Sequence, residues 1–208
     1  MSKGLVIIIT GHGKGKTTSA LGQALRAVGQ GLKVLMIQFL KSSTIYGEIK
    51  SAKKLFPDFE IIQAGKPCIR IPRTGPSGQV PRTGPSGQAK NAYDCTDCNF
   101  ECHIDPKNPS QEDKEAAQKA FALAQEKIKS GKYNLIILDE IIYAIDYGLI
   151  SVDSVLKLIN GKPEDLHLIL TGRNAPPQLA READLVSEIL EIKHPFQQGL
   201  KSVRGIDF

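Results

Sequence analysis

Tryptophan is absent from this sequence of 208 residues, and methionine occurs only twice. Long apolar runs are absent as well, since none approaches the roughly 20 residues that a membrane-spanning helix requires. We therefore expect a soluble protein with no membrane partner. The first apolar stretch, residues 5–9, is too short for the core of a signal peptide, and no small-residue cleavage site follows it. We accordingly expect a cytoplasmic location.

Charge of one sign is not concentrated in any part of the sequence. The 27 lysines and arginines exceed the 22 acidic residues by five, but they are dispersed rather than gathered on one helix or stripe. Because proteins that bind nucleic acid usually carry a basic patch, we expect no nucleic-acid partner. The length suits one domain, residues 1–208, since a single core of this size can bury most of its apolar surface.

Short β-branched runs alternate with longer amphipathic segments. The runs that we predict to be strands cover residues 5–9, 34–39, 59–62, 135–138 and 166–170. Such alternation is typical of a parallel sheet covered by helices. One helix is predicted from Thr17 to about Gly29, and another from 111 to 129, with Ser110 as its N-cap and Gly131 just past its end. The predicted fold class is α/β with a mostly parallel central sheet.

An insertion at about residues 64–106 interrupts this alternation. Within it the octapeptide Pro-Arg-Thr-Gly-Pro-Ser-Gly-Gln occurs twice, at residues 72–79 and 81–88. A segment so rich in proline, glycine and serine buries too little apolar surface to offset the entropy of ordering it. We interpret it as a mobile insertion within the single domain. A basic lid that uses Arg73 and Arg82 is the functional alternative.

A glycine-rich turn lies between the first predicted strand and the first predicted helix. Its candidate nucleotide-binding residues are Gly11, His12, Gly13, Lys14, Gly15, Lys16, Thr17 and Thr18. Glycines let backbone amides face phosphate oxygens, Lys16 can neutralise the outer phosphates, and the Thr17 hydroxyl can bind Mg²⁺. The strict P-loop pattern has glycine where this chain has Thr10, so the turn is a variant P-loop. It predicts ATP binding and a RecA-like P-loop NTPase fold; a plain connecting turn is the alternative.

Two acidic residues, Asp139 and Glu140, follow the predicted strand 135–138. Ligands of α/β sheets bind at the carboxyl ends of the strands, which is where these two carboxylates are expected. Together with an upstream P-loop, they predict a site for Mg²⁺ or Mn²⁺ beside the nucleotide. Taken alone, a strand that ends in Asp-Glu is often only a solvated loop.

The sequence resembles the P-loop family of ATP:corrinoid adenosyltransferases over most of its length. The resemblance rests on residues 10–18, 26–29, 38–41, 47–48, 138–140, 143, 171–173, 183–184, 193–196 and 205–208. The loop of this family also lacks the first glycine of the strict pattern. The irregularity at Thr10 therefore favours this family over ordinary ATPases.

The resemblance implies a reaction in which the Co(I) centre of a reduced corrinoid attacks the ribose C5′ of ATP and expels triphosphate. The nucleophile then comes from the substrate, and the protein has to align C5′ and stabilise the leaving group. By resemblance, Lys16 and Glu140 serve catalysis, Thr17 and Glu140 hold the metal, and Arg26 and Arg173 lie near the nucleotide. Each arginine has a surface ion pair as its alternative. A reductase that supplies electrons and a homodimer are further expectations.

Cysteine is scarce, and all four cysteines lie between residues 68 and 102. Cys95, Cys98 and Cys102 form a C-x2-C-x3-C pattern, and thiolates this close can share Zn²⁺ or an iron–sulfur cluster, with Cys68 as a fourth ligand. Free thiols are the alternative, because the second C-x2-C pair of a typical zinc site is missing.

Two other functions compete with the adenosyltransferase. A RecA-like ATPase or kinase that acts on nucleic acid or another phosphate acceptor would explain the P-loop and would produce ADP. A non-enzymatic regulatory module would bind ATP without turnover. Neither explains residues 171–173 and 193–208 together with the variant loop.

Overall fold

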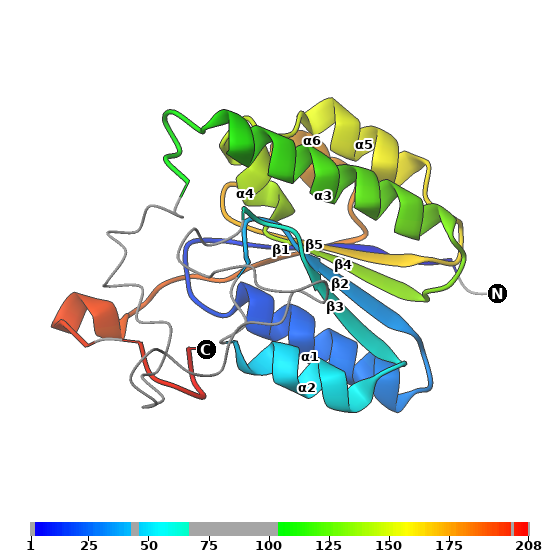
Figure 1. The fold of residues 1–208 in the computed structure, drawn as a ribbon, viewed down its shortest axis with the longest axis horizontal. Coiled ribbons are helices and arrows are strands. Elements are labelled where there is room, and N and C mark those ends of the chain that lie inside the picture. The colour runs from blue at the N-terminus through cyan, green and yellow to red at the C-terminus, as the bar shows by residue number, and fades with distance from the viewer. Residues whose placement is uncertain (1–2, 43–45, 67–103, 201, 208) are drawn as a thin grey trace, which may run out of the picture.

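The computed structural model describes residues 3–42, 46–66, 104–200 and 202–207. These residues form a sheet with helices on both faces (Figure 1). The sheet has the spatial order β3-β2-β4-β5-β1-β6, and its strands are β1 (Val6–Thr10), β2 (Val34–Gln38), β3 (Phe59–Gln63), β4 (Leu135–Asp139), β5 (His167–Thr171) and β6 (Leu185–Glu188). All of its strand pairs are parallel, which confirms the predicted α/β class.

The helices divide between the two faces of the sheet. They are α1 (Lys16–Gly29), α2 (Gly47–Leu55), α3 (Gln111–Lys129), α4 (Ile141–Asp146), α5 (Val152–Asn160) and α6 (Pro177–Glu182), with a short 3₁₀ helix, η2 (Pro195–Gln198). In Figure 1, α1 and α2 lie below the sheet, and α3, α5 and α6 lie above it. This arrangement is typical of P-loop NTPases.

The central strands are apolar except at their ends, because helices cover both of their faces. In β2, Leu35 and Ile37 pack into the cluster that contains the alanines of α3, whereas Val34 and Met36 pack on the opposite face with the alanines of α1. All four side chains are fully buried. A strand with a single buried face would alternate with polar residues, as side chains point to opposite faces in turn.

Helix α3 begins and ends where the sequence predicts. The Ser110 hydroxyl accepts a hydrogen bond from the Asp113 N–H at 3.2 Å, and the Asp113 carboxylate accepts one from the Ser110 N–H at 2.9 Å. This reciprocal capping box satisfies two N–H groups that the helix leaves unpaired. Helix α1 begins at Lys16, one residue before the prediction.

The strand order brings polar residues from distant parts of the chain to one edge of the sheet. Gln38 and Asp139 are register partners at the ends of β2 and β4, and Thr171 at the end of β5 is the partner of Ile9 in β1. The loop after β1 starts from the same edge. The carboxyl edge of the sheet therefore carries the candidate site, as expected for an α/β fold.

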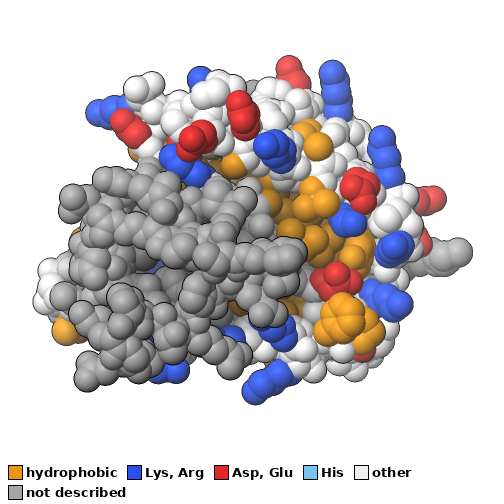
Figure 2. All heavy atoms as spheres, viewed as in Figure 1, with side chains coloured by type: hydrophobic (Ala, Val, Ile, Leu, Met, Phe, Trp, Pro, Cys, Tyr) orange, Lys and Arg blue, Asp and Glu red, His pale blue; other side chains and the backbone are white. Residues whose placement is uncertain are grey.

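Some expectations concern parts of the chain that the structure does not describe. The two octapeptides and Cys68, Cys95, Cys98 and Cys102 lie outside the described residues. Among the helices that are described, none has the length and apolar character needed to cross a membrane. On the face drawn in Figure 2, basic and acidic side chains of the described residues are interspersed.

Candidate nucleotide site

The glycine-rich loop joins β1 directly to α1 and curls around the side chain of Lys16. The Lys16 ammonium donates hydrogen bonds to the carbonyl oxygens of Gly11 at 2.7 Å and Gly13 at 2.8 Å. Gly11 and Gly15 have φ values of 102° and 119°, in the region where residues with a Cβ are strained. The predicted P-loop geometry, with its lysine at the centre of the loop, is therefore present.

The segment that follows β6 packs against the outside of this loop. The Gly13 N–H donates to the carbonyl oxygen of Ile189, and the Ile189 N–H donates to that of Thr10, both at 2.8 Å. A Cβ on Gly13 would lie 2.6 Å from the carbonyl oxygen of Leu190, and one on Gly11 would lie 2.4 Å from that of Ile189. These two glycines thus allow the chain after β6 to pack closely on the loop, in addition to the predicted approach of phosphate. The packing role was not predicted from the sequence.

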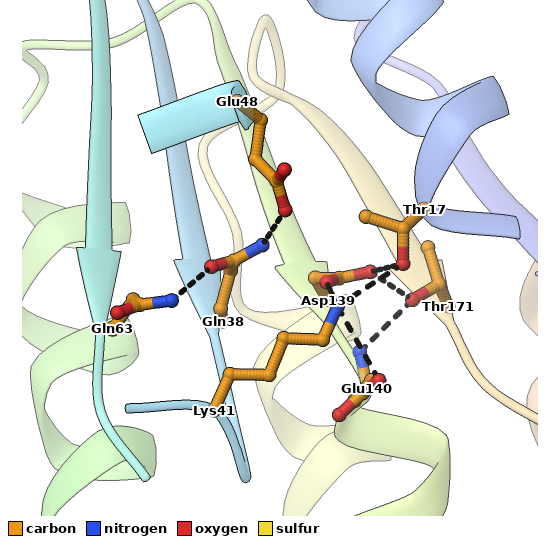
Figure 3. Close-up of polar contacts among 8 residues, drawn as sticks. All are labelled: Thr17, Gln38, Lys41, Glu48, Gln63, Asp139, Glu140 and Thr171. Atoms are coloured by element: carbon orange, nitrogen blue, oxygen red, sulfur yellow. Dashed lines mark hydrogen bonds and ion pairs between the residues drawn. The ribbon is translucent and has the colours of Figure 1, made fainter. Parts of the chain in front are cut away.

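Asp139 lies at the centre of a buried hydrogen-bond network, shown in Figure 3. Its side chain is fully buried, and Oδ1 accepts from the hydroxyls of Thr17 at 2.9 Å and Thr171 at 2.7 Å. The Thr171 hydroxyl also accepts from the Glu140 N–H at 2.9 Å. Glu140 has a φ of 65° and is the N-cap residue of α4. The network therefore ties the P-loop helix, β4 and β5 together at one point.

Lys41 inserts its ammonium into the same network. The nitrogen lies 2.9 Å from Asp139 Oδ2, 3.4 Å from Glu140 Oε1 and 3.4 Å from Thr17 Oγ1. Burial would lower the pKa of Lys41, but the nearby carboxylates of Asp139 and Glu140 outweigh burial and raise it. Lys41 therefore stays charged and balances these acids.

Two other pKa shifts reflect the crowding of charge in the site. Burial, followed by the guanidinium of Arg173, lowers the pKa of Lys16, and the carboxylates of Glu140 and Asp139 offset this only in part. Burial raises the pKa of Glu140, against the opposing ammonium of Lys41. Both groups are partly withdrawn from water, where charges interact more strongly than at the surface.

The residues predicted to bind a divalent cation converge on one position. Asp139, Glu140 and Thr17 each place an oxygen within 3.4 Å of the Lys41 nitrogen, so a positive charge already stands among them. Carboxylate and hydroxyl oxygens suit Mg²⁺ or Mn²⁺, and this donor set therefore fits such an ion. Among the described residues, no three His, Cys, Asp or Glu side chains form a separate metal-binding group.

A cavity of about 600 Å³ opens beside this network. Its lining includes Lys14, Gly15, Lys16, Thr17 and Thr18 of the P-loop, Lys41, Tyr46, Gly47 and Glu48 around the start of α2, Glu140 and Tyr143 of the α4 region, and Gly205, Ile206 and Asp207 near the C-terminus. Lys14 forms an ion pair with Asp207. Loop, helix and C-terminal segment thus enclose one space of the size that a small ligand needs.

A second hydrogen-bond chain positions Glu48 at this cavity (Figure 3). Gln63 donates to the side-chain oxygen of Gln38 at 3.0 Å, and Gln38 donates to Glu48 at 3.2 Å. Gln38 is fully buried, so its amide needs both partners. Glu48, in the first turn of α2, is thereby held by the ends of β2 and β3.

The predicted arginines are placed differently from each other. Arg173 follows β5 and lies over the ring of Tyr143, which lines the cavity, with its guanidinium carbon 6.0 Å from the ring centre. Arg26 lies on the exposed side of α1, ten residues beyond Lys16, and is not part of the lining. His12 is exposed at the outside of the loop. Arg173 is thus brought toward the site, and Arg26 is not.

Lys41 and Thr171 belong to the site but received no role from the sequence. Lys41 lies three residues after β2, and Thr171 is the last residue of β5; this position near the carboxyl end of an apolar strand was the signal available. Their importance depends on contact with Asp139, which lies 98 residues from Lys41 and 32 from Thr171.

The fold and the site together define a P-loop nucleotide-binding protein. The family model described as ATP:corrinoid adenosyltransferase BtuR/CobO/CobP matches residues 2–208. The chain is 31% identical to a corrinoid adenosyltransferase of Sinorhizobium sp over 99% of its own length and 81% of the relative. For the corrinoid adenosyltransferase of Escherichia coli K12, identity is 29% over 99% of this chain and 86% of the relative. The chain belongs to the ATP:corrinoid adenosyltransferase family.

Proposed function

We propose that this protein transfers the 5′-deoxyadenosyl group of ATP to the Co(I) centre of a corrinoid and releases triphosphate. Membership of the family identifies the reaction class, which is adenosyl transfer from ATP to a corrinoid in cobalamin biosynthesis. The observation that carries the proposal is the cavity, because it is lined by Lys16 of a variant P-loop and by the acidic residue Glu140. Service in corrinoid salvage is part of the same proposal.

The proposed step needs no nucleophile from the protein. Co(I) of the corrinoid substrate supplies an electron pair that forms the new bond to C5′. The bond between C5′ and the triphosphate oxygen breaks, and triphosphate leaves with the electron pair of that broken bond. Cobalt is thereby oxidised formally to Co(III). The task of the protein is to align C5′ and to stabilise negative charge on the leaving group.

Lys16 is the side chain best placed to stabilise the leaving triphosphate. Its ammonium now donates to two carbonyl oxygens of the loop, and phosphate oxygens would replace those acceptors when ATP binds. Lys14, Thr18 and the amides of the loop would bind further phosphate oxygens. Arg173 would add positive charge next to Tyr143 at the cavity wall. A role for Arg26 would require contacts outside the cavity.

Thr17, Asp139 and Glu140 are the residues that would hold Mg²⁺ or Mn²⁺. A divalent cation bound with ATP supplies additional charge stabilisation for the triphosphate. Thr171 would orient Asp139 through its hydroxyl, since both share a hydrogen bond of 2.7 Å. A Zn²⁺ or iron–sulfur site at Cys95, Cys98 and Cys102 is a separate proposal. A mobile insertion, a reductase partner, a homodimer and a cytoplasmic location are further proposals.

The proposal is tested by incubating the protein anaerobically with ATP, Mg²⁺ and chemically reduced cobalamin. We expect a light-sensitive adenosylated corrinoid and one triphosphate for each transfer. Lys16→Ala should lower kcat/KM about 100-fold or more, the range seen when a transition-state charge partner is removed. Lys119→Ala is the matched control, because Lys119 is exposed on α3, and α3 covers the face of the sheet opposite to α1. ADP without corrinoid alkylation would instead identify an ATPase or kinase.

A further inference from the structure

Lys41 places a positive charge among the oxygens proposed to bind the divalent cation. Asp139 Oδ2, Glu140 Oε1 and Thr17 Oγ1 come from the end of β4, the start of α4 and the first turn of α1, and all lie within 3.4 Å of the Lys41 nitrogen. Figure 3 shows the extended side chain of Lys41 pointing into this group. Only 15% of the Lys41 side chain is exposed.

The backbone around Lys41 is held in place to direct the side chain inward. Leu40, just before it, has a φ of 36°, an uncommon conformation for leucine. The Lys41 carbonyl accepts a hydrogen bond from the Gly65 N–H at 2.9 Å, and a Cβ on Gly65 would lie 2.5 Å from the Lys41 nitrogen of the backbone. The chain after β3 therefore packs directly on this turn and fixes it.

An ammonium and a divalent cation cannot use these oxygens at the same time. Mg²⁺ binds its oxygen ligands at about 2.0–2.1 Å, which requires the space where the Lys41 nitrogen lies. Two cations so close together would also repel each other strongly in a site with little water. Binding of metal by Asp139, Glu140 and Thr17 therefore requires Lys41 to move.

We propose that Lys41 is an exchangeable internal cation, which holds Asp139 and Glu140 until a divalent cation arrives together with ATP. This inference rests on the proposed metal site and adds to it an order of binding for metal and nucleotide. Metal alone would have to expel the ammonium without offering it a new anionic partner in place of Asp139 and Glu140. The triphosphate of ATP brings such a partner into the cavity that Lys41 lines, so metal and nucleotide enter together.

The exchange is distinguished from a permanent structural ion pair by metal binding in the absence of nucleotide. We would titrate Mn²⁺ into nucleotide-free protein and count free Mn²⁺ by electron paramagnetic resonance. Lys41→Met replaces lysine by an unbranched side chain that is one atom shorter and has no charge. This variant should bind Mn²⁺ at least about tenfold more tightly than the wild type, as measured by Kd. Lys41→Arg should bind Mn²⁺ as weakly as the wild type does. Adding Asp139→Asn to Lys41→Met should abolish the gain.

Lys66→Met is the matched control for removing a partly buried lysine. Lys66 is 16% exposed, lies 3.6 Å from Glu112 and 3.9 Å from Asp113, and is not among the residues that line the cavity. This variant should leave Mn²⁺ affinity unchanged. Equal Mn²⁺ affinities of Lys41→Met and wild type would overturn the inference.

Two further measurements keep the outcomes separate. Mn²⁺ binding by wild-type protein with ATP present tests the proposed metal site itself. If the wild type does not bind Mn²⁺ under these conditions, the proposed metal site is wrong, and not only the role of Lys41. If Lys41→Met is unfolded without ligands, because two carboxylates are left unbalanced, added Mn²⁺ should restore its circular dichroism spectrum. Failure of Mn²⁺ to do so, with normal binding of Mn²⁺ and ATP by the wild type, would also overturn the inference.

Discussion

Thr171 shows how one hydroxyl connects two parts of the site. It is 1% exposed, donates to Asp139 and accepts from the backbone N–H of Glu140, so both of its hydrogen-bonding functions are used. The following residue, Gly172, has a φ of 143° and passes so close to α4 that a Cβ would lie 2.7 Å from that of Ile142. The turn after β5 is therefore shaped to place this hydroxyl between Asp139 and Glu140.

Thr171→Val should lower the free energy of unfolding by about 1–3 kcal/mol, because a methyl group replaces the hydroxyl and leaves the buried Glu140 N–H unpaired. It should also lower adenosyl transfer, since Asp139 loses one of the groups that orient it. Urea denaturation and the corrinoid assay measure the two effects. Thr171→Ser keeps the hydroxyl and should be much closer to the wild type. A loss in Thr171→Ser as large as that in Thr171→Val would contradict this role of the hydroxyl.

The edge strand β6 is attached to the sheet through Asp184, which directly precedes it. The Asp184 carboxylate accepts from the Val6 N–H at 2.8 Å and pairs with Lys3 at 3.3 Å, while the Asp184 N–H donates to the Val6 carbonyl at 2.8 Å. All four side chains of β6 are exposed, so little apolar burial holds the strand. Correct attachment of β6 matters for the site, because Ile189, which follows it, contacts the P-loop.

The hydrogen bond from the Val6 N–H, followed by that from Lys3, lowers the pKa of Asp184. The ionised carboxylate therefore stabilises the fold at a pH above about 4, the ordinary range for aspartate, and this contribution is lost as pH falls through the lowered pKa. Asp184→Asn should have a lower melting temperature than the wild type at pH 7, and the difference should shrink as pH falls below about 4. Asp58→Asn, at another exposed acid, should show no such trend. A difference that stays constant with pH would contradict the proposed role of the charge.

The walls of the cavity come from distant parts of the chain, namely the loop after β1, the region from β2 to α2, the start of α4 and the last described residues. Lys14 and Asp207, which form an ion pair, lie near opposite ends of the sequence. Several apolar side chains of the C-terminal segment are exposed, among them Ile192, Phe196 and Ile206. The hydrogen bonds of Ile189 with the loop and the ion pair of Lys14 with Asp207, rather than deep burial, connect the chain after β6 to the site.

Because all these segments line the cavity that we propose binds ATP, binding of ATP with Mg²⁺ should stabilise the molecule as a unit. At a free concentration of 100 times Kd the expected gain is about 2.7 kcal/mol, visible as a concentration-dependent rise in Tm. Adenosine lacks the phosphates that the P-loop would bind and should produce a much smaller rise. A rise of equal size with adenosine would mean that the loop does not recognise phosphate. Calorimetric melting with each ligand measures both.

Much of this molecule follows from local sequence patterns. The apolar runs predicted the strands β1 to β5, and Ser110 and Gly131 predicted the bounds of α3. These features depend on residues a few positions apart, where hydrogen bonding and side-chain periodicity act directly. The short strand β6 was missed, because its four exposed residues show neither a buried run nor a clear alternation.

The residues of the candidate site also fall into those that short motifs predicted and those that only the folded structure showed. Lys16, Thr17, Asp139 and Glu140 were recognisable because each lies in a short motif next to a strand. The ammonium of Lys41 among the acids, the hydroxyl of Thr171 on Asp139 and the packing of Ile189 on the P-loop became visible only in the folded chain. These contacts join residues that are far apart in sequence and are set by the order of strands in the sheet. Local periodicity carries no information on that order, because any parallel arrangement of the same strands would bury the same apolar residues.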